Sequence, residues 1–225
     1  MIVLGFDTAT PATAVALLDS AAPGDAAERR HDPQPGARPG HASQLLALAH
    51  ALLEDAGLTF AAIDRVAVGL GPGGFTGLRI GVSTARALAQ AADAQIVGVS
   101  TLQALALAAD PRPGQGVLAV VDARRGEVFA GGWRDGEPVL GPVAVAPSAV
   151  GALAGPGWLA VGDGALRFRD DLEGAGLVVP QDSSAQHGVS ARTVCRLALG
   201  GETGTERDLV IPDYLRKPDA VRSKP

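Results

Sequence analysis

Residues 71–81 read Gly71-Pro72-Gly73-Gly74-Phe75-Thr76-Gly77-Leu78-Arg79-Ile80-Gly81, so that five of eleven consecutive residues are glycine. The apolar run Val66–Leu70 before them is typical of a buried strand, and the helical period after them predicts a helix over residues 76–92. The core-facing positions of that helix would be Leu78, Val82, Ala85, Ala89 and Ala92. Because glycine has no Cβ, this stretch predicts a tight reversal and a helix packed close to a sheet.

Two phosphate-binding loops share part of this pattern, and their context argues against both. Residues 69–74 match G-x-G-x-x-G, but a hairpin and a helix precede the strand, so it does not open a βαβ unit. The next strand ends at Val99-Ser100 without the acidic residue that would hold a ribose. A P-loop needs a lysine directly after the glycines, and here Arg79 comes too late.

The rest of the N-terminal half alternates strands and helices. Apolar runs predict strands over 2–6, 13–18 and 96–99, and a helix over 41–56. Residues 20–40 are rich in Pro, Gly, Arg and Asp, which favours a surface excursion holding a weak third strand. Ser100-Thr101-Leu102-Gln103 forms a capping box that opens a third helix, running to Ala109. A mixed α/β sheet with helices packed on it follows from this order.

A Pro- and Gly-rich linker over 110–116 predicts a domain boundary, with one domain over 1–110 and a reduced companion over 111–225. The companion has predicted strands over 117–121, 128–133 and 159–161, and a helix over 189–199.

Composition limits the functional classes. Of the 225 residues 47% are hydrophobic, which disfavours a disordered chain. The net charge of −5 disfavours a strongly basic protein that coats nucleic acid by itself. A single cysteine, Cys195, excludes an internal disulfide and a cysteine-based zinc site, and its helical context predicts a buried structural thiol. Without a signal peptide or a membrane-length apolar run, a soluble cytoplasmic protein is expected.

Few residues suggest catalysis. The histidines at 31, 41, 50 and 187 form no i,i+4 pair, and no G-x-S-x-G elbow is present. Asp7 ends the first strand, where it would either orient a magnesium-bound nucleotide or simply form the turn.

The string over 71–81 resembles the GPGSFTGLRIG signature of the TsaB family of bacterial tRNA threonylcarbamoyladenosine biosynthesis proteins. Its signature residues are Gly71, Pro72, Gly73, Gly74, Phe75, Thr76 and Arg79. The segments 6–10, 98–102, 122–128, 161–164 and 214–216 match the family in the same order, so that the resemblance covers nearly the whole chain. Gly74 departs from the serine that the family usually has, and residues 20–40 look atypical of it.

The resemblance implies an actin-like ATPase fold, with two ribonuclease-H-like subdomains of mixed sheets flanked by helices, the second one reduced. It also implies a place in the complex that moves a threonylcarbamoyl group from its adenylate to N6 of adenosine 37 in tRNAs reading codons that begin with A. The catalytic subunit of that complex is the paralogue TsaD, and the ATPase TsaE joins them. This chain would contact tRNA only indirectly, through the complex.

Catalysis by this chain itself is not expected. The catalytic paralogue carries an H-x-x-x-H metal-binding pair, and the matching positions here are Thr101 and Leu105, so the resemblance implies no metal site. Asp7, Thr8 and Thr10 are the residues that would bind a nucleotide. No tightly bound cofactor is expected, and ATP or ADP at the partner interface is the ligand that the resemblance allows.

The helices over 41–56 and 76–92 both have spare apolar or small faces, which suggests a helical bundle with the paralogue, or a twofold homodimer when the paralogue is absent. The interface residues would be His41, Leu45, Leu46, Leu53, Gly77, Ile80, Gly81, Thr84 and Leu88. A weak stand-alone ATPase is the main alternative, whereas a glycoprotease-like enzyme lacks its metal pair and a pure tRNA-binding module is disfavoured by the acidic balance.

Overall fold

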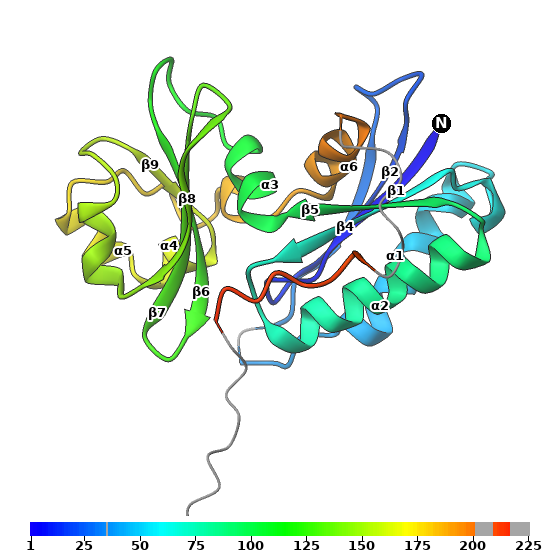
Figure 1. The fold of residues 1–225 in the computed structure, drawn as a ribbon, viewed down its shortest axis with the longest axis horizontal. Coiled ribbons are helices and arrows are strands. Elements are labelled where there is room, and N and C mark those ends of the chain that lie inside the picture. The colour runs from blue at the N-terminus through cyan, green and yellow to red at the C-terminus, as the bar shows by residue number, and fades with distance from the viewer. Residues whose placement is uncertain (35, 201–208, 217–225) are drawn as a thin grey trace, which may run out of the picture.

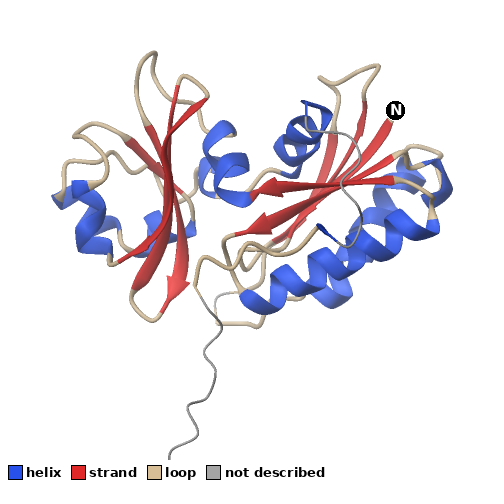
Figure 2. Cartoon of the chain, in the orientation of Figure 1, coloured by secondary structure: helices blue, strands red, loops and turns tan. Residues whose placement is uncertain are grey.

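The computed structural model describes residues 1–34, 36–200 and 209–216. Two sheets flanked by helices lie side by side (Figures 1 and 2). The first sheet has the order β3-β2-β1-β4-β5. Its strands are β1 (Ile2–Asp7), β2 (Thr13–Asp19), β3 (Ala27–His31), β4 (Arg65–Gly71) and β5 (Gln95–Ser100). The weak third strand predicted within residues 20–40 is therefore confirmed.

The second sheet repeats the plan of the first. Its strands are β6 (Val117–Arg124), β7 (Glu127–Arg134), β8 (Glu137–Val145) and β9 (Leu159–Val161), in the order β8-β7-β6-β9. In both sheets the first strand pairs antiparallel with the second and parallel with the fourth. A single parallel bridge from Leu159 to Val178 lies on the side of β9 where the first sheet has β5. The expected pair of related sheets, with the second one reduced, is confirmed.

Strand β8 was not predicted, and its sequence explains why. It holds Pro138, Gly141 and Pro142 and lies at the edge of its sheet, where most of its residues are exposed. Proline is tolerated on edge strands because it cannot donate to the ladder. The strand therefore lacks the apolar alternation from which strands are recognised in sequence.

Helices cover both faces of the first sheet (Figure 2). The helices α1 (His41–Asp55) and α2 (Phe75–Ala91) pack on one face, over Leu4, Phe6 and Val68. The helices α3 (Thr101–Leu107) and α6 (Ala191–Gly200) share the other core with Val3 and the second sheet. Among the described residues, no helix is long and apolar enough to cross a membrane.

Helix α6 comes from the second half of the chain but packs on β1 and β2 of the first sheet. A Cβ on Gly5 would lie only 2.5 Å from Cys195 Sγ, so this glycine allows the close approach. Cys195 is fully buried, and burial raises the pKa of its thiol to about 12, which confirms a buried thiol. The first sheet is thus covered in part by a helix beyond residue 110, while the predicted division into domains stays a prediction.

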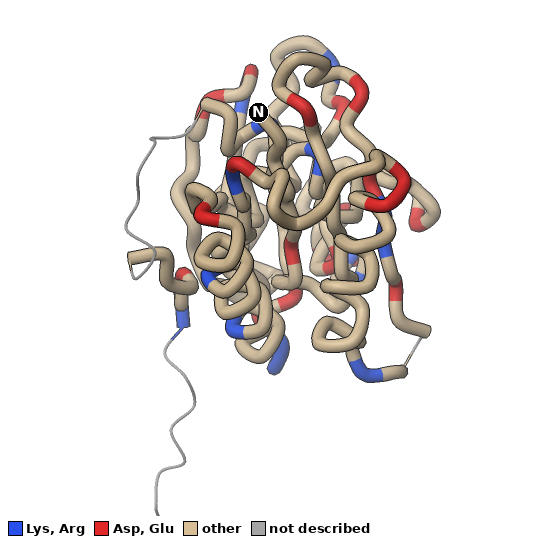
Figure 3. The backbone as a smooth tube through the Cα atoms, turned by 90° about the vertical axis from the view of Figure 1, so that its right-hand side faces the viewer, with Lys and Arg blue, Asp and Glu red and all other residues tan. Residues whose placement is uncertain are grey.

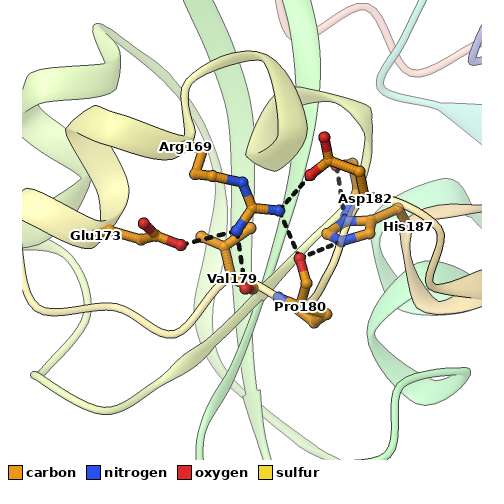
Figure 4. Close-up of polar contacts among 7 residues, drawn as sticks. Arg169, Glu173, Val179, Pro180, Asp182 and His187 are labelled. Atoms are coloured by element: carbon orange, nitrogen blue, oxygen red, sulfur yellow. Dashed lines mark hydrogen bonds and ion pairs between the residues drawn. The ribbon is translucent and has the colours of Figure 1, made fainter.

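The segment that leads from the second lobe back to α6 is held by several side chains, among them Arg169 and His187, whose Nε2 lies 3.1 Å from Pro180 O (Figure 4). Arg169 begins α5 (Arg169–Gly174), and its guanidinium donates to the carbonyls of Val179 and Pro180. It also pairs with Glu173 and Asp182. The short helices α4 (Asp163–Arg167), η2 (Pro147–Ala152) and η3 (Ala185–His187) complete this lobe, and η1 (Phe60–Ala62) precedes β4.

Candidate functional site

The glycine loop lies directly against the turn between β1 and β2. A Cβ on Gly73 would overlap the carbonyl oxygen of Ala9, and a Cβ on Gly77 would overlap that of Thr8. Hydrogen bonds fix the same contact, because Gly74 N donates to Ala9 O at 2.7 Å and Thr8 Oγ1 donates to Gly77 O at 2.8 Å. The interpretation of these glycines as close-packing positions is confirmed.

Asp7 lies under this turn and faces inward. Its side chain is buried, with Oδ1 accepting from Ala9 N at 2.8 Å and Oδ2 accepting from Thr101 Oγ1 at 2.6 Å. Burial raises the pKa of Asp7, although the Thr101 and Ala9 hydrogen bonds oppose the shift. Both carboxylate oxygens are therefore engaged within the chain, as befits a turn-forming residue.

In the sequence, Thr101 appeared within the capping box and as a position without a metal ligand, and its long-range structural role was missed. Its Oγ1 also accepts from Gly71 N at 3.1 Å, so one hydroxyl joins the end of β1, the glycine loop and the start of α3. Its sequence neighbour Ser100 caps α3 as predicted, because the Ser100 hydroxyl accepts from Gln103 N. No local signal distinguishes the long-range role of Thr101 from ordinary helix capping.

We expect Asp7→Asn to change how stability depends on pH. Folding raises the pKa of Asp7 above its ordinary value of 3.8. Protonated Asp7 therefore contributes to the free energy of unfolding in full below pH 3.8, and this contribution is lost as the pH rises through the folded pKa. The free energy of unfolding of the unchanged chain, relative to Asp7→Asn, should therefore fall from pH 4 toward neutrality. Urea unfolding at several pH values measures this, with the exposed Asp25→Asn as the matched control. Parallel pH profiles for all three proteins would contradict the expectation.

A cleft of about 480 Å³ lies between the two lobes and contains the predicted nucleotide-binding threonines. Thr8 and Thr10 line it on one side, and Asp122 and Asp163 on the other. Asp163 is half-buried, desolvation raises its pKa, and it accepts from Asp122 N at 3.1 Å. The lining also includes Arg38 and Arg124, whereas Asp7 is not among the lining residues. Nucleotide binding therefore stays a prediction.

The two positions that match the metal-binding histidines of the catalytic paralogue are apolar or already engaged. Leu105 is fully buried in the core, and Thr101 is bonded to Asp7. Within the described ranges, no group of three or more His, Cys, Asp or Glu side chains is arranged to hold a metal ion.

A groove of about 370 Å³ runs between α1 and α2 on the surface, and we call it the α1–α2 groove. Its lining consists of His41, Ala42, Leu45, Leu46, Arg79, Ile80, Ser83 and Thr84. Leu46 is 48% exposed, and other accessible apolar side chains lie beside it in the groove. Adjacent exposed apolar side chains of this kind are typical of interaction surfaces. His41 ends the groove, where burial lowers its pKa and Nδ1 lies 2.9 Å from Thr13 Oγ1.

The structure divides the nine predicted interface residues into two groups. Leu46, Ile80, Thr84 and Leu88 have accessible surface. Five are buried within the chain: His41, Leu45, Leu53, Gly77 and Gly81. Leu53 packs into the core of the first sheet, so it offers no surface to a partner. Thr8 fills the space in front of Gly77 and Gly81. The face of small residues that the sequence left for a partner helix therefore packs against the turn between β1 and β2.

The signature loop is buried at its start and exposed at its end. Gly71 and Pro72 are buried and Gly73 is partly buried, whereas Gly74, Phe75, Thr76 and Arg79 are exposed. Sequence reasoning missed what meets these exposed residues, which is the segment over 209–216 running along α2 (Figure 1). The Phe75 and Tyr214 rings have centroids 5.2 Å apart, and the Arg79 guanidinium carbon lies 3.8 Å from the Phe75 centroid.

Residues 209–216 are fixed at several points. Val210 is buried against the core of the first sheet, and Asp213 N donates to Leu70 O at 2.8 Å. Arg216 pairs with Glu127 at 2.7 Å and so reaches the second lobe. The match of residues 214–216 to the family was the one sequence signal for this segment.

Comparisons with known proteins agree on one family. Residues 32–159 match the family model described as TsaD: tRNA N6-adenosine threonylcarbamoyltransferase. The chain is 34% identical over 190 residues to the tRNA threonylcarbamoyladenosine biosynthesis protein TsaB of Escherichia coli. This match covers 80% of this chain and 78% of that protein. An uncharacterized protein of Mycobacterium tuberculosis is 37% identical over 150 residues, and the match spans 62% of this chain and 63% of that protein's length.

A solved structure supports the same relationship. The crystal structure of an uncharacterized Pseudomonas aeruginosa protein with similarity to the peptidase YEAZ superposes with a TM-score of 0.77 at 31% identity. The superposition covers 96% of this chain and 99% of that one.

Proposed function

Because the chain belongs to the TsaB family of tRNA threonylcarbamoyladenosine biosynthesis proteins, we propose that it is a non-catalytic subunit that binds and supports a TsaD-type catalytic paralogue. The α1–α2 groove is the observation that carries the proposal. It presents Leu46 and Ile80 beside the small side chains of Ser83 and Thr84, which allow close helix approach. A second helix pair laid across this groove would bury the accessible apolar surface.

The interior of the chain supports a non-catalytic role. In this proposal, Asp7 and Thr101 stabilise the turn against which the glycine loop packs, and they take no part in chemistry. The TsaD-type partner supplies the metal site and the transfer reaction. The ATPase TsaE joins the complex, tRNA reaches it mainly through the partner, and the groove forms a homodimer when the partner is absent.

Reconstitution tests the proposed function directly. The chain and the TsaD-type paralogue from the same cell are expected to elute as one complex whose mass, by light scattering, exceeds that of either protein. Threonylcarbamoyl transfer to tRNA should need both proteins together with the rest of the pathway. A paralogue that transfers the group at the same rate without this chain would overturn the proposal.

A weak stand-alone ATPase is the second candidate, and the cleft between the lobes is the observation in its favour. It requires steady magnesium-dependent phosphate release by the purified chain, lost in Asp7→Ala. Release that survives this change would identify a contaminant. The inward hydrogen bonds of Asp7 favour the scaffold over this alternative.

A further inference from the structure

A second hollow, of about 390 Å³, lies beside the glycine loop and outside the α1–α2 groove. One wall is formed by Phe75 and Tyr214, and the opposite wall by Arg124 and Arg125 in the turn between β6 and β7. We call it the aromatic–arginine hollow. All four residues lie in segments that match the family, over 71–81, 122–128 and 214–216, but the proposed scaffold role gives this combination of side chains no task.

The aromatic wall is exposed and held in place. Phe75 is 38% and Tyr214 is 37% exposed. Arg79 fixes both rings, because its guanidinium stacks on Phe75 and its Nε donates to the Tyr214 hydroxyl at 3.1 Å. Exposed aromatic rings next to guanidinium groups are the surfaces on which unpaired bases stack, and such stacking tolerates any base sequence.

The opposite wall carries exposed guanidinium groups. The Asp122 side chain is only 5% exposed and lies between two guanidiniums, with Arg124 at 3.2 Å and Arg167 at 2.8 Å. These two arginine side chains are 62% and 51% exposed, so part of each faces solvent. The lining as a whole has three arginines and two aspartates, and one of the arginines, Arg216, pairs with Glu127.

Charge is unevenly distributed over the molecule. Figure 3 shows arginine-bearing segments along the lower edge of the tube, while acidic segments are frequent in its upper part. In the same vertical orientation, Figure 1 places the start of α2 and the turn between β6 and β7 at that lower edge. The net charge of the whole chain, which disfavours RNA binding, therefore does not describe the surface at this lower edge.

The turn that presents the arginines is a tight hairpin. Arg124, Arg125 and Gly126 are consecutive left-handed residues, with φ of 63°, 55° and 78°. Arg125 and Gly126 form the two-residue loop between the paired residues Arg124 and Glu127, and positive φ at both loop positions is usual in such hairpins. Asp122 Oδ1 accepts from Arg124 N at 2.8 Å, and Arg216 donates to Ala123 O at 3.1 Å. These hydrogen bonds hold the turn that places Arg124 and Arg125 in the lining of the hollow.

We propose that the aromatic–arginine hollow binds an unpaired segment of the tRNA that the complex modifies, with a base on the Phe75–Tyr214 wall and backbone phosphates at the arginine wall. The inference rests on the proposed function, since it places the chain in a complex that acts on tRNA. In this proposal, the contacts of the hollow with tRNA add to the tRNA contacts made by the catalytic partner. The hollow lies next to the cleft between the lobes, and Phe75 and Arg124 line both.

The test uses the reconstituted complex with labelled tRNA and fluorescence anisotropy over a range of salt concentrations. The variant is Arg124→Gln/Arg125→Gln, and the matched control is Arg112→Gln/Arg134→Gln, which removes two exposed arginines elsewhere. The first variant should weaken tRNA binding about tenfold at physiological salt and reduce the slope of log K against log salt by about two. The control should leave both quantities unchanged. Ultraviolet cross-linking should join tRNA to peptides containing Phe75 or Tyr214.

Each other outcome has a defined meaning. Unchanged affinity and slope with an intact complex would overturn the RNA proposal and leave the scaffold role standing. Loss of the complex itself in the arginine variant would show that the hollow binds protein, and loss of ATP binding with tRNA binding intact would show that it binds free nucleotide; either result overturns the proposal. If the unchanged chain forms no complex, the proposed function fails, and the same titration with the chain alone still decides whether this hollow binds RNA.

Discussion

Thr84→Arg is expected to weaken binding to the TsaD-type paralogue by at least about 100-fold, while the thermal midpoint of the chain itself stays nearly unchanged. Thr84 is half-buried and lines the α1–α2 groove. In the free chain a longer side chain can extend from this groove into water. In the complex its charge would be buried without a partner, and a cost of about 3 kcal/mol corresponds to roughly a 100-fold loss of affinity.

The control for this variant lies on the same helix. Gln90→Arg adds the same charge at an exposed position of α2 that does not line the groove. Calorimetric titration with the purified paralogue measures both affinities, and light scattering reports whether the homodimer is lost as well. Normal affinity for Thr84→Arg would place the interface elsewhere on the molecule. Equal losses for both variants would indicate a general charge effect in place of a contact at the groove.

Gly77→Ala should lower the free energy of unfolding by about 2–3 kcal/mol. The new Cβ would overlap the carbonyl oxygen of Thr8, which is backbone and cannot rotate away. Alanine is the better helix former by about 1 kcal/mol, so the overlap must outweigh that gain. The hydrogen bond from Thr8 Oγ1 to Gly77 O would be distorted by the same movement.

A neighbouring glycine offers a control of opposite sign. Gly74 is the N-cap of α2, no side chain caps that end, and a Cβ there would lie 3.4 Å from Ala9 O, which is a tolerable contact. Gly74→Ser introduces the residue that the family usually has and adds a capping hydroxyl, so stability should rise by a few tenths of a kcal/mol. Urea unfolding of the two variants should therefore shift in opposite directions. If Gly77→Ala is as stable as the unchanged chain, the close approach of α2 to the turn between β1 and β2 is incorrect.

Local patterns predicted most of the fold because they reflect local physics. Leu78, Val82, Ala85 and Ala89 recur at the helical period, and all four are buried on the inner face of α2. The glycines of the loop indicated a close approach, and the structure shows it. Strand β8 escaped prediction because an edge strand with two prolines buries too little to show a period.

The candidate interface was predicted less completely, for a related reason. A helical period shows which residues share a face, but not whether that face meets the chain's own core or a partner. Leu53 shares a helix with the exposed Leu46 and is fully buried. Gly81 is small enough for a partner helix to approach, yet the Thr8 hydroxyl already occupies the space in front of it.

The sequence alone was sufficient for the strands and α-helices of residues 1–110, the close-packed glycine loop and the family, because these depend on residues near one another along the chain. Folding brought together the groups on which the site depends. Thr101 meets Asp7 across 94 positions, and Tyr214 meets Arg79 across 135. No spacing rule links residues so far apart, because their meeting depends on how two sheets and a returning segment pack. The inward-facing aspartate and the aromatic–arginine hollow therefore became visible only in three dimensions.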